Sequence, residues 1–183
     1  MNGDLLARWR VRLGYPLAMV VFWLARPTAR SLVWGGIIGI AGLLVRGLAA
    51  GFLKKQETLT IAGPYSYTRN PLYLGSAALA AGFAAACHSW YAAAVVAAYF
   101  ACFYPPVMRR EERELQARYG TSFDDYAARV PLFFPGFTPV RFADAKDQAF
   151  SWKQYAKNRE YQAAAGFILV FGVLYLLMRW RGR

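Results

Sequence analysis

The sequence has few of the residues that build soluble catalytic or metal centres. Among 183 residues it has two cysteines and one histidine. Cys87 and Cys102 both lie inside apolar runs, without CxxC or metal-ligand spacing, so the sequence predicts neither a disulfide framework nor a metal site. His88 lies beside Trp90 and Tyr91 with no second ligand near it. We interpret it as a residue of the membrane interface rather than a base or a ligand.

Acidic residues are also scarce. The sequence has ten Asp and Glu residues and 22 Lys and Arg residues, which gives a net charge of +12. The basic residues mostly flank apolar runs, where they would meet lipid headgroups, whereas a nucleic-acid site would gather them on a soluble face. The predicted partner is therefore the lipid bilayer, with no nucleic acid, and no oligomeric state is predicted.

What the sequence has in abundance is apolar residues, 57% of the chain. The first apolar run is about 13 residues long, roughly 20 Å as a helix, and so falls short of a hydrocarbon core of about 30 Å. The apolar runs are residues 13–25, 32–53, 71–87, 89–108 and 161–178. We expect an all-α fold: a polytopic integral membrane bundle of about five transmembrane or membrane-embedded helices, forming a single domain over residues 1–183.

The second run carries two features of membrane helices. Gly35 and Gly39 form a GxxxG motif that Gly42 continues, which favours close contact with another helix. Arg46 interrupts the run, so it must snorkel, pair or face a polar cavity. We favour an anchor at the cytoplasmic end over a site residue.

After residue 108 the chain becomes highly charged. Helical spacing continues to Tyr119, and Gly120 is a typical stop signal. The aromatic and proline-rich residues 132–142 suit the membrane interface, and we expect residues 144–160 to form a polar helix. The positive-inside rule places the charged stretches 54–70 and 109–159 in the cytoplasm. The last run then ends on the opposite side with three arginines, contrary to that rule.

The stretch GPYSYTRNPLYLG, residues 63–75, begins the third run. Asn70 is a strong N-cap, and Pro71 suits the first helical position because its missing N–H is not needed there. The free N–H groups of this helix end, together with Arg69, predict a site for a carboxylate or a phosphate.

Two acidic residues follow the hairpin on the same side of the membrane. Glu111 and Glu112 point about 100° apart on a helix, so one is expected to face a pocket and the other to pair with arginine. With Tyr65, Tyr67 and Tyr73 as aromatic walls, the site would fit S-adenosylmethionine, which has a carboxylate, a cation and a heterocycle. A salt-bridged helix face and a tyrosine belt at the interface are the structural alternatives.

Both stretches together resemble the isoprenylcysteine carboxyl methyltransferase family and its phospholipid methyltransferase relatives. The family pattern runs GPY, R-H-P-x-Y-x-G, a helical hairpin, E-E-x-x-L, F-G, Y and V-P. The resemblance covers about residues 35–137, and residues 138–183 form an extra amphipathic segment and helix. The matching residues are Gly63, Pro64, Tyr65, Arg69, Pro71, Tyr73, Gly75, Glu111, Glu112, Leu115, Gly120, Tyr126, Val130 and Pro131.

The resemblance implies a methyltransferase that uses S-adenosylmethionine on a lipophilic methyl acceptor, with its cofactor pocket facing the cytoplasm. The implied activity is most like protein-S-isoprenylcysteine carboxyl O-methylation. The implied cofactor-binding residues are Tyr65, Arg69, Asn70, Pro71, Tyr73, Leu74, Glu111 and Glu112. The implied catalytic residues are Glu111, Glu112, Arg109 and Arg110, the arginines positioning an anionic acceptor.

Asn70 departs from the pattern, in which histidine is usual. The phospholipid N-methyltransferases look similar in having N-P-x-Y, so phospholipid or amine N-methylation and small-thiol S-methylation stay open. A sterol-type membrane reductase using NADPH and a non-enzymatic scaffold are the alternatives of other classes. Abundant alanine, glycine and arginine indicate a prokaryotic inner membrane.

Overall fold

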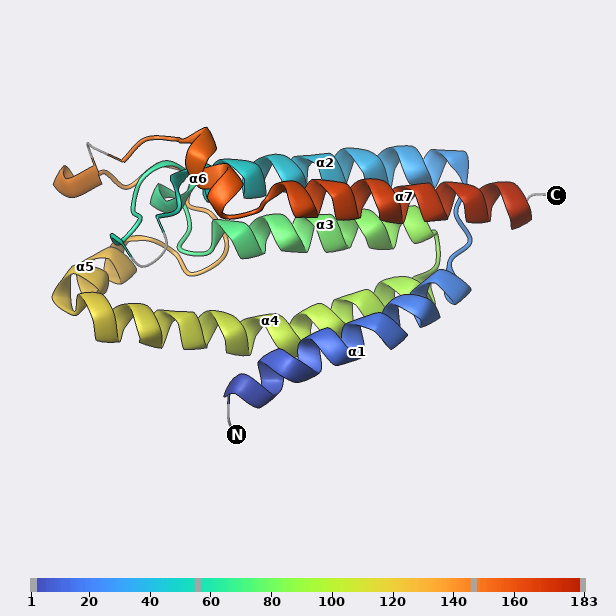
Figure 1. Ribbon diagram of the computed structural model, residues 1–183, viewed down its shortest axis with the longest axis horizontal. Coiled ribbons are helices and arrows are strands. Elements are labelled where there is room, and N and C mark those ends of the chain that lie inside the picture. Colours follow the sequence, from blue (N-terminus) through green and yellow to red (C-terminus); the bar gives the residue numbers. More distant parts are fainter. Residues whose placement is uncertain (1–2, 55–56, 146–147, 182–183) are drawn as a thin grey trace. The chain divides into compact units, whose positions relative to one another are not determined.

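The computed structural model describes residues 3–54, 57–145 and 148–181 (Figure 1). These residues form seven α-helices and two 3₁₀ helices and contain no strand, which confirms the predicted all-α fold. The elements are α1 (Gly3–Leu24), α2 (Ala29–Phe52), η1 (Gly63–Ser66), α3 (Pro71–Cys87), α4 (Trp90–Tyr119), α5 (Thr121–Arg129), η2 (Ala143–Ala145), α6 (Trp152–Lys157) and α7 (Tyr161–Arg181).

Three of the described helices, α2, α4 and α7, are long and apolar enough to cross a membrane. The apolar part of α1, Arg12–Leu24, and the whole of α3 are apolar but shorter. These five stretches correspond to the five apolar runs of the sequence. Large apolar side chains such as Trp34 and Leu169 are exposed on α2 and α7, as expected where a helix faces lipid rather than water.

The chain divides into two compact units. Unit 1 contains residues 1–41, 77–110 and 165–183, and unit 2 contains residues 42–76 and 111–164. The single domain expected from the sequence stays a prediction.

Unit 1 is packed through small residues. A Cβ atom on Gly82 of α3 would lie 2.6 Å from both the Gly35 carbonyl oxygen and the Gly39 nitrogen of α2, so the backbones of these helices touch. Gly39 also lies against the ring of Phe167 on α7. The glycine stripe of the second apolar run is therefore a packing surface, as its spacing predicts.

The end of α1 explains one of the arginines that the positive-inside rule disfavours. Arg181 of α7 donates a hydrogen bond of 3.1 Å to the carbonyl oxygen of Trp23 and a second to Ala25. Arg26 donates to the same two carbonyls over 3.0 Å. Because the last carbonyls of a helix lack partners within it, these guanidinium groups serve as a cap for α1.

An open apolar groove of about 270 Å³ lies between α3 and α4 within unit 1. It is lined mostly by alanine, whose side chains are too short to fill the space between the two helices. The lining residues are Ala77, Ala80, Ala81, Ala84, Ala93, Val96, Ala97, Phe100 and Ala101.

Unit 2 has its own small core of buried apolar residues, namely Ile61, Phe123, Tyr126 and Val130. Gly120 adopts φ 54° where α4 ends, so the predicted stop is confirmed. The chain then turns directly into α5.

The single polar helix expected over residues 144–160 is wrong. The described part of this stretch holds the end of η2 and the six-residue α6, and the rest is irregular. The Gln148 side chain accepts from the Ile61 nitrogen and donates to the Leu59 oxygen, both over 2.9 Å. The Ser151 nitrogen donates to the Gly51 oxygen over 3.0 Å. In a continuous helix the backbone nitrogen of Ser151 would donate to a carbonyl oxygen of the same helix, whereas here it donates to Gly51 of another segment.

Candidate functional site

The segment that leads into α3 is held in place by the residues after α5. The Arg69 nitrogen donates to the Pro131 oxygen over 2.9 Å, and the Thr68 hydroxyl donates to the Phe133 oxygen over 2.9 Å. The Asn70 side-chain nitrogen donates to the Leu132 oxygen over 3.0 Å. The carbonyl oxygens of residues 131–133 thus accept the hydrogen bonds that hold this segment, and we call these three residues the ledge. Their aromatic and proline-rich composition does not indicate this role.

Asn70 occupies the position before the first helical residue, as predicted. Its carbonyl oxygen accepts from the Leu74 nitrogen over 2.9 Å, which begins α3, and Pro71 stands at the first helical position. Asn70 is 8% exposed. Because its amide donates to Leu132, the side chain also ties the helix start to the ledge.

Glu111 and Glu112 make separate contacts, as expected for neighbours on a helix. Glu112 pairs with Arg69, with 2.8 Å between Oε1 and Nη1 and only 22% and 17% of the two side chains exposed. The Tyr73 hydroxyl donates to Glu111 Oε1 over 2.7 Å. The two stretches that the sequence pattern links, residues 63–75 and residues 111–112, therefore meet within unit 2.

The Arg69–Glu112 pair is close but poorly aligned. Arg69 Nε and Glu112 Oε1 are both buried, and neither has a hydrogen-bond partner among the described residues. A short ion pair whose atoms lack aligned bonds leaves donor and acceptor capacity unused. These two residues therefore fit a ligand that brings an acceptor for the guanidinium and a donor for the carboxylate, as the amino-acid moiety of S-adenosylmethionine does.

Tyr65 is only 7% exposed, so its ring does not form the open aromatic wall that the sequence predicted. The Tyr126 hydroxyl donates to the Tyr65 carbonyl oxygen over 2.8 Å. Burial raises the pKa of both tyrosines well above the usual value of 10.0. Both hydroxyls are thus neutral at physiological pH.

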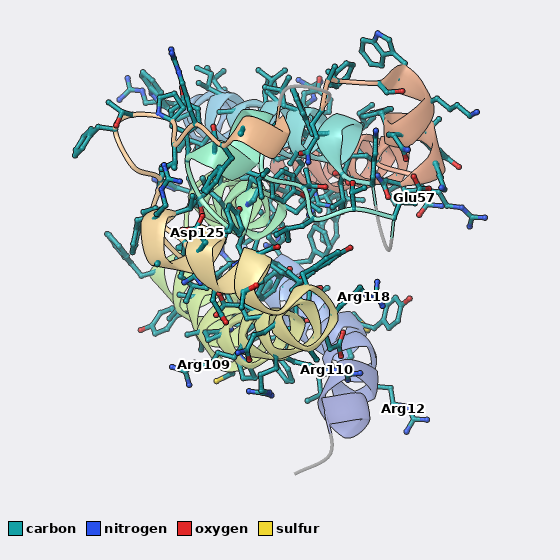
Figure 2. All side chains as sticks on the ribbon, turned by 90° about the vertical axis from the view of Figure 1, so that its left-hand side faces the viewer. Arg12, Glu57, Arg109, Arg110, Arg118 and Asp125 are labelled. Carbon is teal, nitrogen blue, oxygen red and sulfur yellow. The ribbon has the colours of Figure 1, made fainter. Side chains whose placement is uncertain are left out.

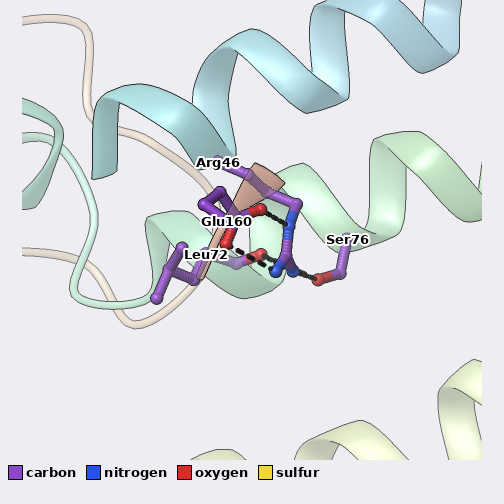
Figure 3. A network of polar contacts seen from close by, with 4 residues as sticks. All are labelled: Arg46, Leu72, Ser76 and Glu160. Carbon is purple, nitrogen blue, oxygen red and sulfur yellow. Dashed lines mark hydrogen bonds and ion pairs between the residues drawn. The ribbon is translucent and has the colours of Figure 1, made fainter. Parts of the chain in front are cut away.

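Arg46 belongs to a polar network that sequence reasoning found only in part (Figure 3). Its guanidinium contacts Glu160 through Nε, over 2.5 Å, and through Nη2, over 3.0 Å. Nη1 donates to the Ser76 hydroxyl over 2.5 Å and to the Leu72 oxygen over 3.4 Å. The signal that would have found Glu160 is a carboxylate placed just before the last apolar run, since an arginine inside an apolar helix needs a counter-charge.

The remaining predicted site residues are Leu74, Arg109 and Arg110. Leu74 is half-buried on the first turn of α3. Arg109 and Arg110 belong to unit 1, and Arg109 is exposed on α4 (Figure 2). Within the described ranges, no group of three or more His, Cys, Asp or Glu residues is placed to hold a metal ion.

Comparison with known proteins bears on the family of the chain. The family model described as phospholipid methyltransferase matches residues 9–122, more than half of the chain. The cobalt-zinc-cadmium resistance protein CzcN of Cupriavidus metallidurans is 34% identical over 140 residues, which are 73% of this chain and 64% of that protein. The nickel-cobalt-cadmium resistance protein NccN of Alcaligenes xylosoxydans xylosoxydans is 33% identical over 140 residues, 73% of this chain and 65% of that protein.

The chain thus spans slightly less than two thirds of the length of these two relatives. No solved structure matches it significantly. The expected resemblance to the isoprenylcysteine-type and phospholipid-type membrane methyltransferases is confirmed by the family match, which includes both site stretches. The chain belongs to the phospholipid methyltransferase family.

Proposed function

We propose that the protein transfers a methyl group from S-adenosylmethionine to a lipophilic acceptor, with the site facing the cytoplasm of a prokaryotic inner membrane. The observation that carries this proposal is the half-buried Arg69–Glu112 pair, 2.8 Å apart, in which Arg69 Nε and Glu112 Oε1 have unused hydrogen-bonding capacity. Membership of a methyltransferase family and the three apolar helices support it.

Each residue of the site has a role in this proposal. Arg69 binds the carboxylate of the methyl donor, and Glu112 binds its amino group or ribose hydroxyls. Tyr73 and Leu74 line the space for the heterocycle, while Tyr65, Asn70 and Pro71 hold the start of α3 in place. The donor supplies a methyl group on a sulfonium, an electrophile that requires no general acid.

The acceptor decides whether a base is needed. A carboxylate or thiolate is already nucleophilic, so in-line displacement needs only positioning. An amine would have to lose a proton, for which Glu111 is suited because it is exposed and bonded to Tyr73. Arg109 and Arg110 would orient an anionic acceptor. We put carboxyl O-methylation first and phospholipid N-methylation and small-thiol S-methylation after it.

The first test is calorimetric titration of the detergent-purified protein with S-adenosylhomocysteine, with NADPH titrated in parallel. Micromolar binding of S-adenosylhomocysteine alone is expected. Binding of NADPH alone would overturn the proposal in favour of a sterol-type reductase, and binding of neither would favour a non-enzymatic scaffold. A labelled methyl donor then ranks acceptors: a prenylated cysteine, phosphatidylethanolamine and a small thiol.

Both curated relatives are named for metal resistance. For this chain we infer that any contribution to metal tolerance would depend on methyl transfer. Growth of a strain in cadmium and cobalt salts, with the wild-type chain or with Glu112→Gln, tests this. Equal protection by the two chains would separate tolerance from the proposed reaction.

A further inference from the structure

The guanidinium of Arg46 joins three parts of unit 2 (Figure 3). It forms a two-point ion pair with Glu160, the residue before α7. On its other side Nη1 reaches Ser76 and the carbonyl oxygen of Leu72, both on α3. One side chain of α2 therefore holds both α3 and the start of α7.

The pair is largely enclosed, with 23% of the Arg46 side chain and 8% of the Glu160 side chain exposed. A charge in such a position is costly unless it is paired and hydrogen-bonded. Arg46 also lies within α2, a candidate membrane span. A simple anchor would extend toward headgroups, whereas this arginine is directed into the protein.

Gly75 makes this arrangement possible. A Cβ atom at this position would lie 2.5 Å from Arg46 Cγ and 2.7 Å from the Gly42 carbonyl oxygen. Any larger residue would push α3 away from α2 at the level of the arginine. The close approach brings Arg46 against the turn of α3 that begins the candidate site.

The contacts of Arg46 bracket the site residues of α3. Leu72 and Ser76 stand on either side of Tyr73 and Leu74, and Tyr73 in turn bonds Glu111. We propose that Arg46 and Glu160 are positioning residues of the methyl-donor site, which hold the first turn of α3 so that Tyr73 and Leu74 face the donor. This inference rests on the proposed function.

The C-terminal segment, which lies beyond the residues matched by the family model, takes part in this positioning. Glu160 is supplied by that segment, and its neighbours attach it to the end of α2. The Asn158 side chain donates to the carbonyl oxygens of Ala50 and Leu53, over 2.8 and 3.0 Å. These bonds therefore hold the Glu160 carboxylate, the counter-charge of Arg46, next to α2.

Arg46→Lys is the informative variant. Lysine keeps the charge for Glu160, but its single nitrogen cannot reproduce the forked contacts to Glu160, Ser76 and Leu72 together. We expect the dissociation constant for S-adenosylhomocysteine to rise about tenfold while the melting temperature changes little. The matched control is Lys157→Met, which breaks the exposed pair that Lys157 forms with Glu57 over 2.7 Å, and it should bind like the wild type.

A double-mutant cycle with Tyr73→Phe separates positioning from general stability. If Arg46 acts through the first turn of α3, Arg46→Lys should weaken binding about tenfold in the wild-type background and less than threefold in the Tyr73→Phe background. Equal losses in both backgrounds, or no loss at all, would overturn the inference while the proposed function stands.

Two further outcomes are distinguishable. If Arg46→Lys does not fold, Ser76→Ala replaces it in the same cycle, because it removes one acceptor and leaves the ion pair intact. Unchanged affinity for Ser76→Ala would then overturn the inference. Failure of the wild-type protein to bind S-adenosylhomocysteine would overturn the proposed function and this inference with it.

Discussion

Tyr73 donates a hydrogen bond of 2.7 Å to Glu111, so a side chain on the first turn of α3 is tied to the C-terminal part of α4. The two residues are 38 positions apart in the chain. The bond joins the two halves of the site through a hydroxyl and a carboxylate. Tyr73→Phe removes the hydroxyl and Glu111→Gln removes the charge, each with little change in the shape of the side chain.

Tyr73→Phe is expected to weaken S-adenosylhomocysteine binding about fivefold. The variant loses one hydrogen bond to an exposed carboxylate, which contributes about 1 kcal/mol. Calorimetry measures the effect, and Tyr91→Phe is the control, because Tyr91 is 76% exposed on unit 1. Wild-type affinity in Tyr73→Phe would remove Tyr73 from the site.

Glu112→Gln is expected to weaken binding more than Glu111→Gln does. Glu112 is mostly buried and pairs with Arg69, and loss of a charged partner costs about 2–3 kcal/mol, or roughly 30- to 150-fold in affinity. Glu111 is exposed, so water compensates part of its loss. The reverse order in calorimetry would contradict the assignment. Asp125→Asn is a control on the surface (Figure 2), because its side chain is 66% exposed.

Gly82→Ala is expected to destabilise the protein by about 1–3 kcal/mol, since its Cβ would overlap the backbone of α2 at Gly35 and Gly39. Gly166→Ala is the matched control. A Cβ at Gly166 would meet nothing within 4 Å, and alanine is the better helix former. The measurement is the melting temperature in detergent, and equal values for the two variants would refute the close contact between α2 and α3.

Alkaline pH is expected to destabilise the protein through Tyr65 and Tyr126. Burial raises the pKa of both above the value of 10.0 that they have when unfolded. Above that pH the unfolded chain loses these protons while the folded chain keeps them, so the free energy of unfolding falls. Below pH 10 the stabilisation is fully present.

Melting temperatures from pH 8 to 11 measure this slope. Tyr126→Phe also removes the hydrogen bond to the Tyr65 carbonyl, so its stability at pH 8 will be lower, but its decline from pH 9.5 to 11 should be shallower than that of the wild type. A parallel decline would show that other groups cause the alkaline loss.

Local signals predicted much of the fold and of the site. Asn70 followed by Pro71 indicated a helix start, and Gly120 indicated a helix end, because caps and stops depend on neighbouring backbone groups. The polar helix over residues 144–160 failed for the opposite reason. Gln148 and Ser151 bond partners about 90 to 100 positions away, which no local pattern contains.

The sequence by itself determined the helical membrane class, the family and the two stretches that carry the candidate site, because apolar run lengths and short motifs are properties of neighbouring residues. Only the tertiary structure decided which charges meet. Arg46 and Glu160 are 114 positions apart, and their pairing depends on the close approach that glycine allows between α2 and α3. Likewise, Glu112 pairs with Arg69 while its neighbour Glu111 accepts a hydrogen bond from Tyr73. The two partners differ because successive side chains of a helix point in different directions, and tertiary packing decides what each direction meets.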